Sequence, residues 1–135
     1  MADGSRTAAL VGVLVVAGAV AAITYNQIDA RRQLDARVHV LTGGDPDIGR
    51  ADLANRPCGS CHEIPGVAGA VGRVGPPLEH FAGRTFIGGR ATNTPENLVR
   101  WIEDPHTIDP QSAMPAMGVG DREARDMAAY LYTLS

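Results

Sequence analysis

The length, composition and charge of the chain limit the functions it can have. The chain has 135 residues, which permits one domain of ordinary size. Its 12 basic residues are all arginine, and against 15 acidic residues they leave a net charge of −3. A weakly acidic chain lacks the basic surface that nucleic-acid binding requires, so we expect no nucleic-acid partner.

Residues 7–25 form an apolar run without a charged side chain. At about 1.5 Å per helical residue the run would span about 28 Å, close to the ~30 Å hydrocarbon core of a bilayer. The alternative is a cleaved signal peptide, in which small residues such as those of Ala17-Gly18-Ala19 follow a shorter apolar core. We expect a retained anchor over residues 1–25, because the polar residues after Tyr25 continue a helical pattern.

Residues 26–44 predict a polar helical stalk that continues from the anchor. Charges of both signs alternate along it, and Arg31 and Asp35 stand at the i,i+4 spacing that supports a solvated helix. Gly43-Gly44 would end the helix and could act as a hinge. A globular domain would then occupy residues 45–135.

The first helix of this domain is predicted to begin at Asp45-Pro46, with Asp as the N-cap and Pro at the first helical position. It would end before Arg56-Pro57. Gly49 would allow another helix to approach closely. The side chains expected to face inward are Ile48, Leu53 and Ala54.

The next five residues, Cys58-Gly59-Ser60-Cys61-His62, form the Cys-x-x-Cys-His signature of haem c attachment. In a helical turn, positions three apart lie on one face, so both thiols can reach the two vinyl groups of one porphyrin edge. A structural zinc site would need about four ligands, and the chain has only 2 cysteines. A thioredoxin-like motif usually sits in a βαβ context, and no strand-like run precedes Cys58. The motif therefore predicts one haem c, covalently bound through Cys58 and Cys61, with His62 on the iron.

The haem motif also determines the predicted orientation of the anchor. By the positive-inside rule, the arginines after the apolar run would keep the following residues in the cytoplasm. Haem is attached to this motif outside the cytoplasm in bacteria, so the motif overrules the arginine count. We expect a single-pass anchor in the bacterial inner membrane, with the haem domain in the periplasm.

The rest of the domain combines loops with two helices. Residues 63–93 are rich in Gly, Pro and small residues, and a loop this long needs a reason, such as wrapping a large cofactor. Thr94-Pro95 would start a helix that ends at Asp104-Pro105. A last helix, over about residues 121–134, has apolar residues at helical spacing: Ala124, Met127, Ala128, Leu131 and Leu134. Tyr130 could also turn inward, against the first domain helix. No segment alternates as a strand, so the predicted fold class is all-α.

These residues together resemble a class I c-type cytochrome in its membrane-anchored, mono-haem bacterial form. The resemblance covers residues 43–135 and rests on the haem motif, on Gly75-Pro76-Pro77-Leu78, on Met114-Pro115 and on the run over residues 126–131. It implies a small helical cytochrome c fold, in which the first and last domain helices cross beside the haem.

The resemblance also implies roles for single residues. The Pro76 carbonyl would accept a hydrogen bond from His62 Nδ1 and so orient this ligand, and Leu78 would pack on the haem. The residues that would line the pocket or hold a propionate are Phe81, Arg84 and Trp101. The chain departs from soluble mitochondrial-type cytochromes by lacking lysine, which puts docking through a ring of lysines in doubt.

The candidates for the sixth iron ligand, opposite His62, are Met114, Met117, His80 and His106. Methionine opposite histidine raises the haem potential and suits electron transfer. Met114 precedes a proline in the loop before the last helix and matches the family position, so it is preferred to Met117. We expect His80 and His106 to be ordinary loop residues.

With both axial positions filled, the iron would have no open site for a substrate. No general acid–base pair or nucleophile stands out, so we expect no catalytic residue and no small-molecule substrate. The expected function is one-electron transport in a respiratory chain, in which the cofactor carries the chemistry. The expected redox partner is a cytochrome bc-type complex, a terminal oxidase or a dehydrogenase.

Two questions about this function stay open at the level of sequence. The small residues of the anchor and the stiff stalk favour a fixed subunit of a complex, whereas a free tethered shuttle would need a mobile hinge at Gly43-Gly44. A haem sensor or a peroxidase-like protein is a further alternative, and it would require Met114 to leave the iron.

Overall fold

The computed structural model describes residues 3–135 and the side chains from Arg6 onward. Residues 1 and 2 of the predicted anchor lie outside the described residues. The chain separates into two compact units, Met1–Leu34 and Asp35–Ser135.

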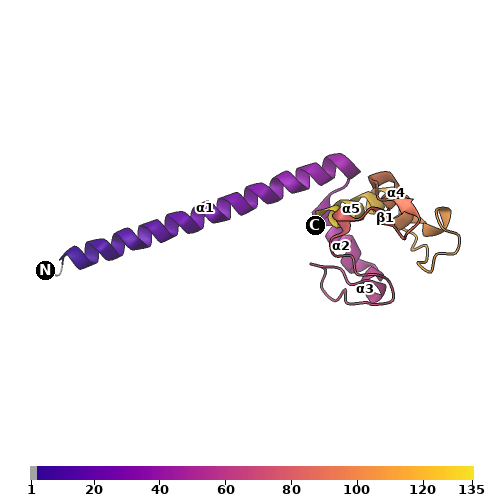
Figure 1. Cartoon of the computed structure of the whole chain (residues 1–135), viewed down its shortest axis with the longest axis horizontal. Coiled ribbons are helices and arrows are strands. Elements are labelled where there is room, and N and C mark those ends of the chain that lie inside the picture. The colour runs from indigo at the N-terminus through magenta and orange to yellow at the C-terminus, as the bar shows by residue number, and fades with distance from the viewer. Residues whose placement is uncertain (1–2) are drawn as a thin grey trace. The chain divides into compact units, whose positions relative to one another are not determined.

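One uninterrupted helix, α1 (Asp3–Thr42), covers the predicted anchor and the predicted stalk (Figure 1). Among the described residues it is the one helix long and apolar enough to cross a membrane, with a mean hydropathy of 2.3 in its most apolar window. None of that window is buried within the described chain. A helix that is apolar on all sides without a protein core around it suits a lipid environment.

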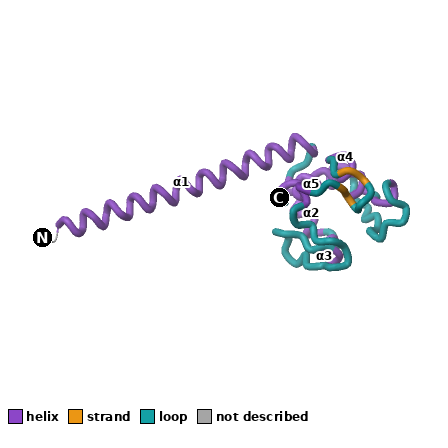
Figure 2. Tube along the Cα trace, in the orientation of Figure 1, coloured by secondary structure: helices purple, strands orange, loops and turns teal. Residues whose placement is uncertain are grey.

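The second unit is helical, which confirms the predicted all-α class (Figure 2). After the end of α1 it contains α2 (Pro46–Asn55), α3 (Cys58–Cys61), α4 (Pro95–Glu103) and α5 (Asp121–Thr133), with the 3₁₀ turns η1 (Phe81–Gly83) and η2 (Pro105–Thr107). Within the predicted loop lies a small antiparallel hairpin of β1 (Phe86–Ile87) and β2 (Ala91–Thr92). The prediction that residues 63–93 contain no strand was wrong here, because two-residue strands are too short to show alternation.

Both predicted helix starts are confirmed. The Asp45 side chain accepts hydrogen bonds from the backbone of Asp47 and Ile48. Thr94 accepts one from the backbone of Asn97. These caps satisfy N–H groups that have no partner within the helix, so they determine where α2 and α4 begin.

Helices α2 and α5 cross with their backbones in contact at Gly49, as predicted for this glycine. A Cβ atom at Gly49 would overlap the carbonyl group of Asp126. The inward face of α2 therefore consists of Pro46, Gly49 and Leu53. The prediction that Ile48 and Ala54 face inward was wrong: both are exposed, Ile48 by 48%, because they lie off the face that carries Gly49.

Helix α5 supplies the centre of the core. Ala124, Met127, Ala128 and Leu131 are buried as predicted, and Leu134 is half-buried. Tyr130 also turns inward, and its hydroxyl donates a 2.6 Å hydrogen bond to the Pro65 carbonyl of the long loop. Helix α5 thus contacts three parts of the domain: this loop, α2 and α4.

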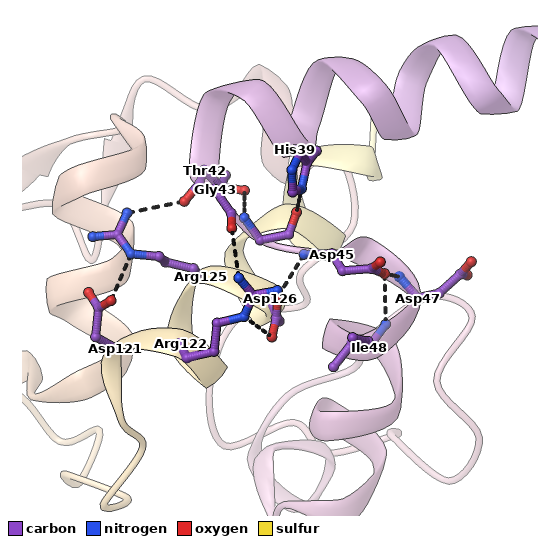
Figure 3. A network of polar contacts seen from close by, with 11 residues as sticks. His39, Thr42, Gly43, Asp45, Asp47, Ile48, Asp121, Arg122, Arg125 and Asp126 are labelled. Carbon is purple, nitrogen blue, oxygen red and sulfur yellow. Dashed lines mark hydrogen bonds and ion pairs between the residues drawn. The ribbon is translucent and has the colours of Figure 1, made fainter.

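The junction between stalk and domain is held by polar contacts with α5 (Figure 3). Arg122 donates a hydrogen bond to the Gly43 carbonyl at 3.3 Å, and Arg125 donates one to the Thr42 carbonyl at 3.1 Å. Thr42 is only 1% exposed, and its hydroxyl accepts a hydrogen bond from Gly44 N at 3.0 Å. The compact unit begins at Asp35 and so includes the end of α1, while the domain boundary at Asp45 stays a prediction.

Candidate haem-binding site

A largely apolar cavity of about 410 Å³ lies in the second unit, within the size range of ordinary cofactor sites. It is lined by the haem motif, the loop before η1, α4, α5 and the loop between η2 and α5. The structure brings together around it all eight residues predicted for the site: Cys58, Cys61, His62, Pro76, Leu78, Arg84, Trp101 and Met114.

The two cysteines lie on a single helical turn. α3 spans Cys58–Cys61, and a 2.9 Å hydrogen bond from His62 N to the Cys58 carbonyl closes the turn. Both cysteines are half-buried, and no disulfide joins them. Burial raises the pKa of the Cys58 thiol above its ordinary value. The turn therefore presents two thiols and one imidazole to the same cavity.

The orientation of His62 is fixed by the segment Gly75-Pro76. The Pro76 carbonyl oxygen lies 2.8 Å from His62 Nδ1, so the hydrogen bond implied by the family resemblance is present. A carbonyl can only accept, so Nδ1 carries the hydrogen and Nε2 keeps its lone pair for a metal. A Cβ atom at Gly75 would overlap the imidazole ring, so this close approach requires glycine.

Arg84 holds the loop that carries Pro76. Its Nη2 donates hydrogen bonds to the Pro77 carbonyl and, at 2.9 Å, to the Glu79 carbonyl. Its guanidinium lies 5.3 Å from the centroid of the Phe81 ring, within the range of a cation–π contact. These contacts give Arg84 a structural role beside the cavity, while a role toward a propionate stays a prediction.

Trp101 forms part of the wall supplied by α4. The residue is half-buried, and its ring lies against Gly88, where a Cβ atom would overlap it. Gly88 has a φ of +55°, which also favours glycine. Leu78 is buried and lines the same cavity.

Of the four candidates for the sixth ligand, the two methionines line the cavity, whereas neither histidine is among the described residues around it. His106 is exposed and lies 3.2 Å from the carboxylate of Asp104. His80 is exposed in a left-handed conformation, with a φ of +51°. The sequence did not suggest Met127 as a cavity residue; it lines the wall from α5 and is only 1% exposed.

The sequence predictions assigned no contact to Arg56 or to Asp126, and each binds a distant part of the chain. Arg56 forms an ion pair with Glu123 of α5, and the buried Asp126 binds the start of α2. Both partners are more than 60 residues away along the chain. In the sequence these residues look like ordinary charged residues, which are usually solvated, so no local pattern indicated their contacts.

The residues around the cavity fit a haem c. Two thiols stand three positions apart on one turn, and the adjacent imidazole has a fixed tautomer with Nε2 available. Thioether sulfurs come from a separate loop, and the remaining wall is mostly apolar. A haem ligated by histidine and methionine would need donors of these kinds.

Comparison with known proteins gives a consistent result. Residues 45–131 match the family described as cytochrome C oxidase, cbb3-type, subunit III. The chain is similar to a cytochrome c oxidase subunit 2 of Alkalihalophilus pseudofirmus, with 36% identity over 104 residues, which are 75% of this chain and 29% of the relative. It is also similar to a cytochrome c oxidase subunit 2 of Bacillus sp. (strain PS3), with 30% identity over 93 residues, 66% of this chain and 26% of the relative. The chain thus spans less than a third of the length of these curated relatives.

Proposed function

We propose that this chain, which belongs to the family described as cytochrome C oxidase, cbb3-type, subunit III, is a membrane-anchored one-electron carrier that serves a terminal oxidase. The family match over residues 45–131 supports electron transport as the general role. The observation that carries the proposal is the cavity to which α3 contributes Cys58 and Cys61, its C-cap contributes His62, and a separate loop contributes Met114.

The haem would be held by four side chains. Cys58 and Cys61 would bind it covalently through their sulfur atoms, and His62 Nε2 and Met114 Sδ would ligate its iron. When bound, haem c supplies a reversible one-electron couple of its iron. The hydrogen bond from His62 to Pro76 would keep the imidazole oriented, and the apolar wall around Leu78 and Trp101 would limit access of water. Met117 would be the alternative ligand to Met114.

A terminal oxidase is the best-supported partner. The two relatives reported above are named as cytochrome c oxidase subunits, which favours an oxidase over a cytochrome bc-type complex or a dehydrogenase. The anchor in α1 would keep the protein in the bacterial inner membrane, and the haem motif favours a periplasmic position for the domain.

The contacts at Gly43-Gly44 support a fixed subunit over a tethered shuttle. A shuttle would need free rotation at these residues, but Arg122 and Arg125 bind the carbonyls of Gly43 and Thr42. Gly44 is also packed so closely on α5 that a Cβ atom would overlap the Arg125 carbonyl. These contacts leave little freedom at the predicted hinge.

Haem attachment can be tested directly. The full chain should be expressed in bacteria with the machinery for haem c attachment, as wild type and as the double variant Cys58→Ala/Cys61→Ala. The wild type should retain haem on a denaturing gel, and the double variant should lose it. Absence of gel-stable haem from the wild type would contradict the proposal.

The partner requires native membranes. The protein should be solubilised in mild detergent, isolated through a tag after Ser135, and its companions identified by mass analysis. Oxidase subunits in stoichiometric amount are the expected result. Isolation of the protein alone would favour the shuttle, and bc-complex subunits would replace the proposed partner.

A further inference from the structure

Arg56 lies where three elements around the cavity meet. It is the C-cap of α2, and its backbone N–H donates a 3.0 Å hydrogen bond to the Asp52 carbonyl. Pro57 and Cys58 follow it in the chain, and the proline further restricts its backbone. The position of Arg56 is therefore fixed directly beside the haem motif.

The Arg56 side chain binds α5 and the loop of residues 113–119, which we call the methionine loop. Its Nε and Nη2 donate to the two carboxylate oxygens of Glu123 at 2.7 and 2.6 Å. Its Nη1 donates to the Met117 carbonyl oxygen at 3.2 Å. A bidentate arginine–carboxylate pair has a well-defined geometry, so Glu123 orients the guanidinium that holds the methionine loop.

The methionine loop has few other hydrogen bonds. Within the described part of the chain, residues 113–119 take part in one more, from Met114 N to Ser112 Oγ at 3.2 Å. That bond lies within the same stretch of chain. Arg56 thus supplies the one hydrogen bond that joins the described methionine loop to another element, and apolar packing of Met117 and Val119 adds to it.

We propose that Arg56 and Glu123 are positioning residues for the axial methionine. The pair fixes the Met117 carbonyl relative to α2 and α5, and so keeps Met114, three positions earlier, at the cavity. The inference rests on the proposed function, because it concerns ligation of the haem. Since methionine opposite histidine raises the reduction potential, the pair would set the potential through the ligand it positions.

The test uses the full-length haem protein in detergent, as wild type, Arg56→Gln and Glu123→Gln. Both variants should lose intensity in the ferric absorption band of the methionine–iron bond, and both should show a lower reduction potential. A charge effect alone predicts opposite shifts: removing the positive charge lowers the potential, and removing the negative charge raises it. A downward shift in both variants therefore identifies positioning.

Arg125→Gln is the matched control. It breaks the 2.8 Å ion pair between Arg125 and Asp121, which both lie on α5, and the hydrogen bond from Arg125 to the Thr42 carbonyl. Neither contact involves the methionine loop. The variant should keep the band even if the free energy of unfolding falls, and its potential should fall no further than the loss of one positive charge explains. Circular dichroism and haem content show whether each variant is folded, and Glu123→Gln keeps the shape of the side chain it replaces.

Two results would overturn the inference. One is a full methionine–iron band in Glu123→Gln together with a raised potential. The other is an equal loss of the band in Arg125→Gln. A wild type with covalent haem but without the band would instead contradict His/Met ligation, and so the proposed function, before any variant is compared.

Discussion

The Asp126 carboxylate accepts a 2.6 Å hydrogen bond from the backbone N–H of Asp45 (Figure 3). Asp126 is only 3% exposed, and its second oxygen pairs with Arg122 Nε at 3.2 Å. One side chain of α5 therefore holds the start of α2. A buried carboxylate is stable here because it has both a hydrogen-bond donor and a cation.

Replacing Asp126 by Ala should lower the free energy of unfolding by about 1–3 kcal/mol, because the Asp45 N–H would lose its partner in a partly buried position. Asp126→Asn keeps an acceptor oxygen and should cost less. Chemical unfolding of the haem protein, followed by circular dichroism, measures both. Equal losses in the two variants would mean that the charge on Asp126, and not its hydrogen bond, is what stabilises α2.

Gly49→Ala should destabilise the domain through the crossing of α2 and α5. The new methyl group would overlap the Asp126 carbonyl, and overpacking of this kind costs about 1–3 kcal/mol or more. Gly83→Ala is the control, because a Cβ atom at Gly83 has no neighbour within 4 Å. Thermal unfolding should show a lower midpoint for Gly49→Ala and little change for Gly83→Ala.

Gly75→Ala should disturb the orientation of His62 more than the stability of the fold. The added methyl group would overlap the imidazole ring and force it away from the Pro76 carbonyl. We expect a lower yield of low-spin haem and a changed ferric absorption spectrum. Gly83→Ala, which adds a methyl group with no neighbour within 4 Å, should leave the spectrum unchanged.

Ionisation of the Tyr132 hydroxyl should lower the free energy of unfolding in strong alkali. Its hydroxyl donates a 2.8 Å hydrogen bond to Asn93 Oδ1, and burial raises its pKa from 10.0 to about 12. The unfolded chain therefore loses this proton at lower pH than the folded one. The contribution of protonated Tyr132 to the free energy of unfolding is complete below about pH 10 and disappears as the pH rises through 12.

Unfolding titrations at several pH values test this difference. Wild type should lose more stability than Tyr132→Phe between pH 10 and 12. At neutral pH the variant should be less stable by about 1 kcal/mol, the usual contribution of one hydrogen bond. Parallel pH profiles of the two proteins would contradict the assignment of the slope to Tyr132.

Local signals in the sequence were sufficient for much of the fold. The caps at Asp45 and Thr94 and the haem motif depend on neighbours within a few residues, so they could be predicted. The class I cytochrome resemblance added the His62–Pro76 hydrogen bond, and the family match over residues 45–131 confirms that resemblance.

Contacts between segments that are distant in sequence could not be predicted from local patterns. The loop of residues 63–72 takes its shape from packing on α3, where Gly72 lies against the Ser60 carbonyl. Ile48 was assigned to the wrong face because the inward side of α2 depends on where α5 crosses it. The pairing of Arg56 with Glu123 spans 67 residues, and no local pattern distinguishes these two charges from solvated ones.

The crossing of α2 and α5 has a consequence for biogenesis. A chain that emerges with its amino terminus first exposes the Cys58 and Cys61 thiols well before α5, which supplies the centre of the core. Contacts of such high sequence separation form late, because the intervening chain must first be brought together. Under the proposed function, this delay would give the attachment machinery an unfolded substrate, and closure by α5 would then enclose the bound cofactor.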